Sequence, residues 1–404
     1  MRRTFAWSAV AMAAAVLPIP AEPARAAPAC ASVASPAPDA VETPWPHRRV
    51  APSRLDGLAT GAGQVVAVID SGVDAGHPQL AGAVSAGADF LDRGGSGRDD
   101  CVGHGTAIAS IIAARPRTGT PVRGLAPAAT ILPVRVSERV PGTDGGRAAS
   151  PAGLAAAIRF AADRGATVIN LSLTLDVDEP AVRAAIAYAA GRNAVIVAAA
   201  GNAHRDGVAA DPPAYPAGYP DVVGVGAVGP DGHRLPSSQV GDHVDLTAPG
   251  GDVVAAARGG GHVLRSGTSF AAAFVSASAA LVRQYRPGLT ARQVADRLRA
   301  TADIGPDGGP GIVNPYRAVT EHLADAPAGP PAPPVASPAA ADERTGTRTE
   351  ARIVAAAGAG LIALALLAAS ALPRGTRRRW RPGRPGGTGP GTRAGNGPIR
   401  TASR

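Results

Sequence analysis

Runs of apolar residues about as long as a β-strand recur through the middle of the chain. Most of these runs are apolar without interruption, which is typical of parallel strands buried on both faces of a sheet. Segments with a helical pattern rich in Ala and Leu lie between them, so the order indicates repeated βαβ units. The sequence therefore predicts an α/β fold with a mainly parallel sheet covered by helices on both faces. The predicted strands are residues 64–69, 131–136, 167–173, 194–199 and 222–228.

Two of the predicted helices carry clear N-terminal signals. Pro151 directly follows Ser150, the usual order of a first helical residue and its N-cap, and predicts a helix over 151–164. Thr290 and Gln293 form a capping-box pattern before a short amphipathic helix that ends near residue 301.

Beyond residue 323 the composition no longer supports a packed core. Residues 324–350 are rich in Pro, Ala, Gly, Thr and charged residues, which predicts an extended linker. Residues 353–372 then form an uncharged apolar run that would span ~30 Å as a helix, so they predict a single transmembrane helix. A buried soluble helix is the alternative interpretation.

The basic residues at the end of the chain fix the expected orientation. Residues 373–404 contain nine Arg and no acidic residue, which equals the whole formal net charge of +9. Such a cluster after a membrane span predicts a cytoplasmic tail, with the folded domain on the outer side. Because the rest of the chain is near neutral, nucleic acid is not an expected partner.

The N-terminus has the pattern of an export signal. Arg2 and Arg3 precede an apolar stretch over residues 5–19, and a small-x-small pattern over 24–26 predicts cleavage after Ala26. An uncleaved N-terminal anchor is the alternative. Residues 27–47 would then be a Pro-rich extension before a domain at 48–323. The two cysteines, Cys30 and Cys101, would enter an oxidising compartment, where a disulfide is expected.

Three short segments are candidates for catalytic chemistry. Asp70 ends an apolar strand, His104 stands between two glycines before a helical pattern, and Ser269 opens a helix of small residues. The carboxyl edge of a parallel sheet suits an Asp that accepts from a His, and a helix N-terminus favours a developing oxyanion. Taken singly, each is as consistent with a turn residue, a surface His or an N-cap. Together they follow the order Asp, His, Ser of subtilisin-type proteases.

At this point the sequence resembles the subtilase family over residues 48–323. The three segments read Asp-Ser-Gly, His-Gly-Thr and Gly-Thr-Ser, as the family's motifs do. Further matching segments are Ala200-Gly201-Asn202, Tyr215-Pro216-Ala217 and Thr247-Ala248-Pro249-Gly250. The resemblance implies a three-layer subtilisin-like fold and a serine endopeptidase that acts on protein or peptide substrates without a cofactor. No clustered carboxylate pattern indicates a metal site.

The resemblance also implies the roles of individual residues. Ser269 would be the nucleophile, His104 the general base and then acid, and Asp70 the group that orients the imidazole. Asn202 would donate to the oxyanion, although a turn residue is the alternative for an Asn after Gly. Leu171, Ser172 and Leu173 resemble the family's substrate-binding strand.

Two positions differ from the family pattern, and two others match it without an expected catalytic role. Thr174 stands where most members have Gly, which predicts a narrower first specificity pocket. Ala273 replaces a usual Pro, for which we expect an effect on stability. Asp74 and His77 also belong to the family pattern, and we interpret them as structural.

Within the subtilases the layout resembles the mycosins, the membrane-anchored proteases of type VII secretion systems. The shared features are the signal peptide, the Cys-bearing extension, Cys101 before the His motif, the linker, the single span and the basic tail. Membrane proteins of a secretion apparatus are therefore expected partners. Two alternatives remain: a structural subunit of that apparatus, and a general surface protease.

Overall fold

The computed structural model describes residues 36–323 except residue 93 and residues 140–145. Within that part of the chain, a seven-stranded sheet runs in the order β2-β3-β1-β4-β5-β6-β7, and every neighbouring pair is parallel. The chain leaves β1 toward β3 on one side and then crosses over to β4 on the other side of β1. The carboxyl ends of β1 and β4 therefore flank the point where the strand order reverses, which is where ligands bind in such sheets. The strands are β1 (Val65–Asp70), β2 (Ala88–Asp89), β3 (Thr130–Arg135), β4 (Val168–Leu171), β5 (Val195–Ala199), β6 (Val222–Val228) and β7 (Leu246–Pro249).

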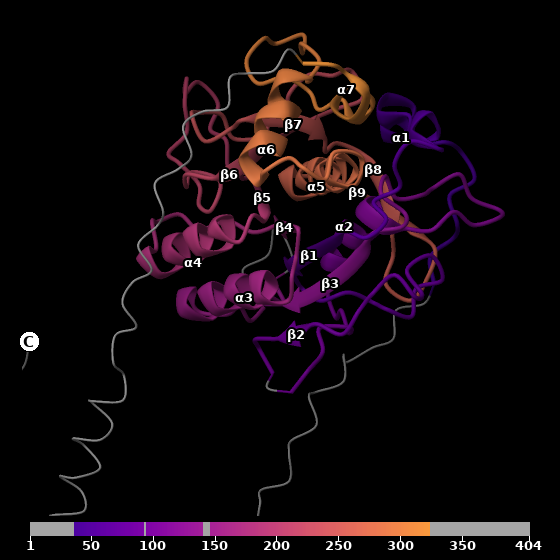
Figure 1. The fold of residues 1–404 in the computed structure, drawn as a ribbon, viewed down its shortest axis with the longest axis horizontal. Helices are drawn as coiled ribbons and strands as arrows, with labels where there is room; N and C mark the ends of the chain where they lie inside the picture. The colour runs from indigo at the N-terminus through magenta and orange to yellow at the C-terminus, as the bar shows by residue number, and fades with distance from the viewer. Residues whose placement is uncertain (1–35, 93, 140–145, 324–404) are drawn as a thin grey trace, which may run out of the picture. The chain divides into compact units, whose positions relative to one another are not determined.

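Helices cover both faces of this sheet, as the hydrophobic pattern predicts (Figure 1). Alternate residues of β1 belong to different cores: Val66 and Val68 pack with α2 and α5, whereas Ala67 and Ile69 pack with α3 and α4. This alternation follows from the two-residue period of a strand, and it explains why the strand sequence is apolar throughout. The helices are α2 (His104–Ala113), α3 (Pro151–Asp163), α4 (Pro180–Gly191) and α5 (Thr268–Tyr285).

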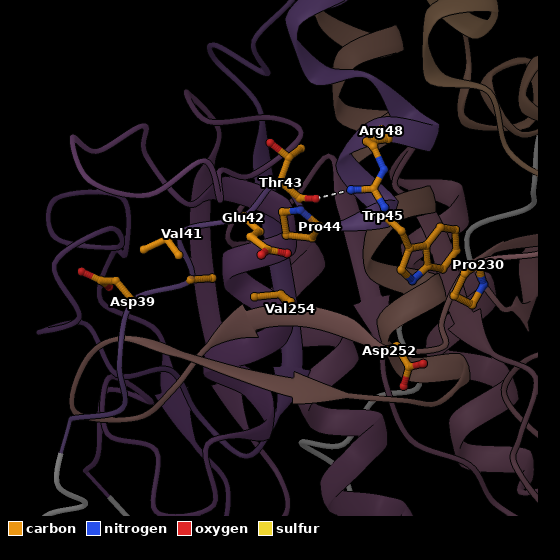
Figure 2. A pocket seen from close by; sticks show the side chains of 11 residues that line it. Asp39, Val41, Glu42, Thr43, Pro44, Trp45, Arg48, Pro230, Asp252 and Val254 are labelled. Carbon is orange, nitrogen blue, oxygen red and sulfur yellow. Dashed lines mark hydrogen bonds between the residues drawn. The ribbon is translucent and has the colours of Figure 1, made fainter.

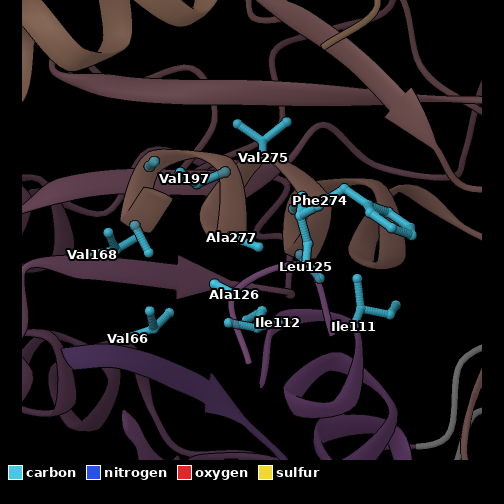
Figure 3. Close-up of a cluster of buried hydrophobic side chains, with 14 of the residues drawn as sticks. Val66, Ile111, Ile112, Leu125, Ala126, Val168, Val197, Phe274, Val275 and Ala277 are labelled. Carbon is cyan, nitrogen blue, oxygen red and sulfur yellow. The ribbon is translucent and has the colours of Figure 1, made fainter. Parts of the chain in front are cut away.

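The core between the sheet and α5 is built from small and branched side chains. Figure 3 shows Val66 and Val168 of the sheet facing Val275 and Ala277 of α5. All residues of α5 from Thr268 to Val282 are buried. Because so many of them are Ala or Ser, the helix can lie close against the sheet. This buries its first turn beside the carboxyl ends of the strands.

Smaller elements complete the described part of the chain. An antiparallel hairpin of β8 (Val253–Ala256) and β9 (His262–Arg265) packs beside α2. The remaining helices are α1 (Trp45–Val50), the 3-10 helix Pro52–Leu55, α6 (Ala291–Ala300) and α7 (Pro315–Thr320).

The first described residues, 36–47, are packed against the hairpin and the residues just before it. The Ala37 amide donates to the Gly260 carbonyl at 3.0 Å, the His262 amide donates to the Pro38 carbonyl at 3.1 Å, and the Trp45 indole donates to the Gly251 carbonyl at 2.8 Å. A cavity of about 570 Å³ lies between this segment and β8, lined by Val41, Trp45 and Val254 among others (Figure 2). None of the predicted catalytic residues lines it.

The predicted elements agree closely with those observed. Each of the five predicted strands is present with its ends shifted by no more than two residues. Ser150 caps α3 through its hydroxyl, and the capping box of Thr290 and Gln293 is formed at α6. The short strands β2 and β7 and the hairpin were not predicted, because segments of two to four residues carry too little periodicity.

Several predicted segments lie outside the described residues. These are the signal peptide at 1–26, part of the extension at 27–47, the linker at 324–350, the transmembrane helix at 353–372 and the tail at 373–404. Among the residues that are described, none of the helices has the length and apolar character needed to cross a bilayer.

Candidate active site

The first two catalytic candidates meet at the carboxyl edge of the sheet. Asp70 is the last residue of β1, and His104 is the first residue of α2. The Nδ1 atom of His104 lies 2.8 Å from Oδ1 and 3.0 Å from Oδ2 of Asp70. Both side chains are buried. A buried carboxylate in this position favours the tautomer that has a proton on Nδ1, which leaves Nε2 as the basic atom.

The surroundings of His104 determine its basicity. Burial alone would lower the pKa of His104, but the charge of Asp70 and its hydrogen bond raise it, and the charge of Asp100 adds to this effect. Arg265 acts in the opposite direction. The net result is a pKa above the ordinary value of a histidine. An imidazole of this kind is a stronger base than a free histidine.

Glycines on both sides of His104 allow its approach to Asp70. Gly103 has a φ of 83°, in the left-handed region that side chains rarely adopt. At Gly105 a Cβ atom would lie 2.1 Å from the carbonyl oxygen of Gly72, far inside contact distance. The loop after β1 and the start of α2 are therefore in backbone contact.

Ser269 lies in the first turn of α5 and borders the same site. Its side chain is buried, and its Oγ donates to the Ser172 carbonyl oxygen at 3.4 Å. The next residue, Phe270, packs its ring edge-on against the imidazole of His104, with 5.3 Å between the ring centroids. The positive end of an 18-residue helix thus lies at the serine.

Asn202 follows β5 and reaches the same helix start. Its Oδ1 accepts a hydrogen bond from the Thr268 amide at 2.9 Å, while the Thr268 hydroxyl accepts from the Gly201 amide at 3.2 Å. Since the carboxamide oxygen is occupied, the Nδ2 group is the end that remains to donate. Asn202 is exposed, so this group is open to a ligand.

The predicted substrate-binding residues also lie at this edge. Strand β4 ends at Leu171, two residues before the end that the sequence predicts, so Ser172 and Leu173 continue beyond the observed sheet pairing. Asn170 donates from Nδ2 to the Ser172 hydroxyl at 2.7 Å and accepts from the Ser276 hydroxyl at 2.9 Å. These bonds join the segment after β4 to α5, which carries Ser269.

The residues that we interpreted as structural have structural contacts. Asp74 accepts from the Gly259 amide at 2.9 Å, and His77 Nε2 lies 3.1 Å from the Gly261 carbonyl oxygen. Both contacts connect the loop after β1 to the hairpin. Cys101 lies in the loop before α2, whereas its predicted partner Cys30 lies outside the described residues, so the disulfide stays a prediction. Within the described residues, no group of His, Cys, Asp and Glu side chains is arranged to hold a metal ion.

Ser71 and Phe270 are among the residues at the site that had no predicted role. Ser71 donates its amide to Asp70 Oδ1 at 2.7 Å, and Phe270 contacts the imidazole. Both are immediate neighbours of catalytic candidates in the sequence. Their position next to Asp70 and Ser269 in the sequence is the only signal that could have indicated a role. Which group each of them contacts is seen only in the structure.

The comparisons with known proteins agree with this architecture. The family model described as the subtilase family matches residues 61–332. The chain therefore belongs to the subtilase family and is a subtilisin-like serine endopeptidase.

Within the family it is similar to the mycosins. Mycosin-1 of Mycolicibacterium smegmatis is 35% identical over 337 residues, which cover 71% of this chain and 74% of that protein. The crystal structure of MycP1 with its N-terminal propeptide removed matches with a TM-score of 0.63 and 35% identity, covering 71% of this chain and 99% of that one. A chain from the structure of the periplasmic assembly of the ESX-5 inner membrane complex matches with a TM-score of 0.63 and 32% identity, over 75% of this chain and 90% of that one.

Proposed function

We propose that this chain is a membrane-anchored, extracytoplasmic serine endopeptidase of a type VII secretion system, and that Asp70, His104 and Ser269 are its catalytic triad. The single observation that carries the catalytic assignment is the buried contact of 2.8 Å between His104 Nδ1 and Asp70, beside the helix turn that bears Ser269. Such a pair is the expected base and orienting group of a serine nucleophile.

The reaction would proceed in two balanced halves. The Ser269 oxygen attacks the carbonyl carbon of the scissile bond while its proton moves to His104 Nε2. The C–N bond then breaks, the leaving amine takes that proton, and an acyl-enzyme remains on Ser269. Water attacks the acyl group with His104 again accepting a proton, and the return of that proton to Ser269 releases the acid.

Two further assignments concern the groups around the scissile bond. Asn202 Nδ2 and the Ser269 amide would donate to the oxyanion, because the Asn202 oxygen is already held by the Thr268 amide. Leu171, Ser172 and Leu173 would pair with the substrate backbone at the rim beyond β4.

The assignment to a secretion system rests on similarity and on the sequence of the C-terminus. The similar proteins include mycosins, and one similar chain was solved within the periplasmic assembly of the ESX-5 inner membrane complex. The apolar run at 353–372 and the nine Arg after it support a single membrane span with the catalytic domain outside.

Labelling with a fluorophosphonate probe tests the catalytic assignment without a known substrate. The purified full chain should form one covalent adduct, located on Ser269 by peptide mass spectrometry. The variants S269A and H104A should not label. A chain that folds but carries no adduct on Ser269 would refute the assignment.

The similarity to a chain of a solved assembly also supports a second candidate function, that of a structural subunit. In that case S269A would support secretion as well as the wild type does in a strain lacking this protein. Under the proteolytic proposal, the same variant should leave at least one secreted substrate uncleaved. Comparing secreted proteins by mass spectrometry between the two strains separates these functions.

A further inference from the structure

Asp100 is a buried carboxylate that has no role in the proposed reaction. It is 2% exposed and lies four residues before His104. Its Oδ1 accepts from the Ser71 hydroxyl at 2.9 Å, the Val102 amide at 3.0 Å and the Gly103 amide at 2.7 Å. Its Oδ2 accepts from the amide and the hydroxyl of Thr106, at 2.8 and 2.6 Å. One side chain thus collects five hydrogen bonds.

These five donors come from both of the segments that form the Asp70–His104 pair. Three residues among them, Val102, Gly103 and Thr106, enclose His104 on either side. The fourth, Ser71, follows Asp70 directly, and its hydroxyl oxygen also accepts from the Gly105 amide at 2.9 Å. Asp100 and Ser71 together therefore tie the turn after β1 to the first turn of α2.

The ionised form of Asp100 fits this arrangement. Burial raises the pKa of Asp100 above its ordinary value and the charge of Asp70 adds to the rise, while the hydrogen bonds from Thr106 and Gly103 oppose it. Every partner is a donor, so a carboxylate satisfies all of them. An Asn at this position would replace one of the two carboxylate oxygens with an NH₂ group. That group cannot accept from the N–H or O–H donors that it would face, so their hydrogen bonds would be lost.

We propose that Asp100 is a positioning residue of the active site, which fixes the approach of His104 to Asp70 by holding the two loops at one carboxylate. This inference rests on the proposed function, because it assumes that His104 acts as the base. None of the hydrogen bonds of Asp100 involves the side chain of Asp70, His104 or Ser269. Its contribution reaches the reaction through the geometry of His104 and through its own negative charge.

The two contributions act on different features of a pH profile. Looser positioning of His104 lowers the plateau rate at high pH, where the imidazole is neutral. Loss of the Asp100 charge lowers the pKa of His104, so the acid limb of the profile moves to lower pH. The other charged groups that affect this pKa, Asp70 and Arg265, are unchanged in the variant. A merely structural defect would lower the plateau without moving the limb toward acid.

The rate at which a fluorophosphonate inactivates the purified full chain, measured from pH 5 to 9, provides both quantities. For D100N we expect the plateau to fall about 10- to 100-fold, since a misplacement of ~1 Å can cost ~10²-fold. We also expect the acid limb to move to lower pH. D99N removes the same charge from the exposed neighbour and should stay within about twofold of the wild type.

S71A provides a second, milder variant in case D100N fails to fold. It removes the hydroxyl that joins Asp100 to Gly105, so the plateau should fall roughly fivefold while the limb stays in place. A D100N profile equal to that of the wild type would refute the proposal. A D100N profile with a lowered plateau but an acid limb at the wild-type pH would also refute it, and so would an S71A plateau rate equal to that of the wild type. A wild-type chain that does not react at all would instead refute the proposed function.

Discussion

Asn202 is held by one end of its side-chain amide, which decides what the other end can do. The Thr268 amide donates to its oxygen, so Nδ2 is the free donor beside Ser269. We predict that N202A lowers kcat for a chromogenic peptide about 10²- to 10³-fold with little change in KM, the range measured for the equivalent donor in a subtilisin. The reason is that the donor acts on the oxyanion and not on the bound substrate.

The variant N202D separates this role from simple support of the loop. Asp keeps an oxygen for the Thr268 amide but has no N–H group to offer. We expect kcat to fall in N202D as it does in N202A, with the thermal midpoint near that of the wild type. Normal kcat in either variant would contradict the oxyanion assignment.

Gly103 and Gly105 flank His104 but differ in what surrounds them. At Gly105 a Cβ would lie 2.1 Å from the Gly72 carbonyl oxygen, whereas at Gly103 the nearest atom is 3.5 Å away and only the positive φ opposes a side chain. We predict that G105A separates the loops of Asp70 and His104 and lowers the inactivation rate ~10²-fold or more. G103A should cost about 1–2 kcal/mol of stability and leave most of that rate. Equal rates in the two variants would contradict this account.

At the residue scale, the sequence predicted the candidate site residues that lie in family motifs. It did not predict the residues whose hydrogen bonds hold the loops of the site together. Asp70, His104, Ser269 and Asn202 could be named because four short motifs occur in one order. Asp100 lies four residues before His104, outside these motifs, and its link to the turn after Asp70 is a hydrogen bond from Ser71, 29 residues away in the sequence. Contacts of that kind have no periodic or local signal, so only the three-dimensional structure reveals them.

At the scale of elements, hydrophobic period and capping chemistry predicted the strands and helices that are long enough to show them. The five buried strands of the sheet were predicted within two residues, because a strand covered on both faces reads as an unbroken apolar run. Strand β7 includes Pro249 and has only four residues, and the hairpin of β8 and β9 is partly exposed. These pieces are specified mainly by their packing, which no local pattern records.

Helix α6 offers a test of how far such a local signal stabilises the domain. Thr290 accepts from the Gln293 amide at 3.3 Å, and the Gln293 side chain accepts from the Thr290 amide at 2.9 Å. We predict that T290A lowers the free energy of unfolding by about 1 kcal/mol, because one N-terminal amide loses its acceptor. T290S keeps the hydroxyl and should lose no more than a few tenths of a kcal/mol. Urea unfolding of the full chain measures both values.

Activity should not follow stability in these two variants. The box is formed at the start of α6, and none of its bonds involves the residues of the candidate active site. The fluorophosphonate rate of T290A should therefore equal that of the wild type at a temperature where both are folded. A slower rate would mean that α6 helps to position α5, with which it is in contact.

At the scale of the whole molecule, histidines lie where the N-terminal segment meets the domain. His262 Nδ1 accepts from the Ala40 amide at 3.1 Å, and Nε2 donates to Gln79 Oε1 at 2.8 Å. His47 Nε2 lies 2.8 Å from the Arg123 carbonyl oxygen, and His77 packs edge-on against His262. Burial lowers the pKa of His47, His77 and His262 below the ordinary value of histidine.

We predict that this arrangement makes the folded domain sensitive to mild acid. A histidine with a lowered pKa binds its proton more weakly in the folded chain than in the unfolded chain. Its neutral form therefore supports folding fully above about pH 6.5, and that support is lost as the pH falls below this value. Burial also lowers the pKa of His243, so this residue adds to the acid sensitivity. His104 and the exposed His233 have raised pKa values, so their protonation stabilises the folded chain and opposes the trend. The thermal midpoint of the full chain should fall between pH 7.5 and 5.5.

The variant H262Q locates part of that sensitivity at the N-terminal segment. Gln can accept from the Ala40 amide and donate to Gln79 as the neutral imidazole does, but it does not titrate. Removing one such histidine should make stability less dependent on pH by up to about 1.4 kcal/mol per pH unit. Burial is the largest cause of the lowered pKa of His262; the nearby Asp39 opposes it, whereas His77, Arg117 and His47 lower the pKa further. An H262Q chain with the same pH dependence as the wild type would show that acid acts elsewhere, and the contact of residues 36–47 with the hairpin would then be independent of pH.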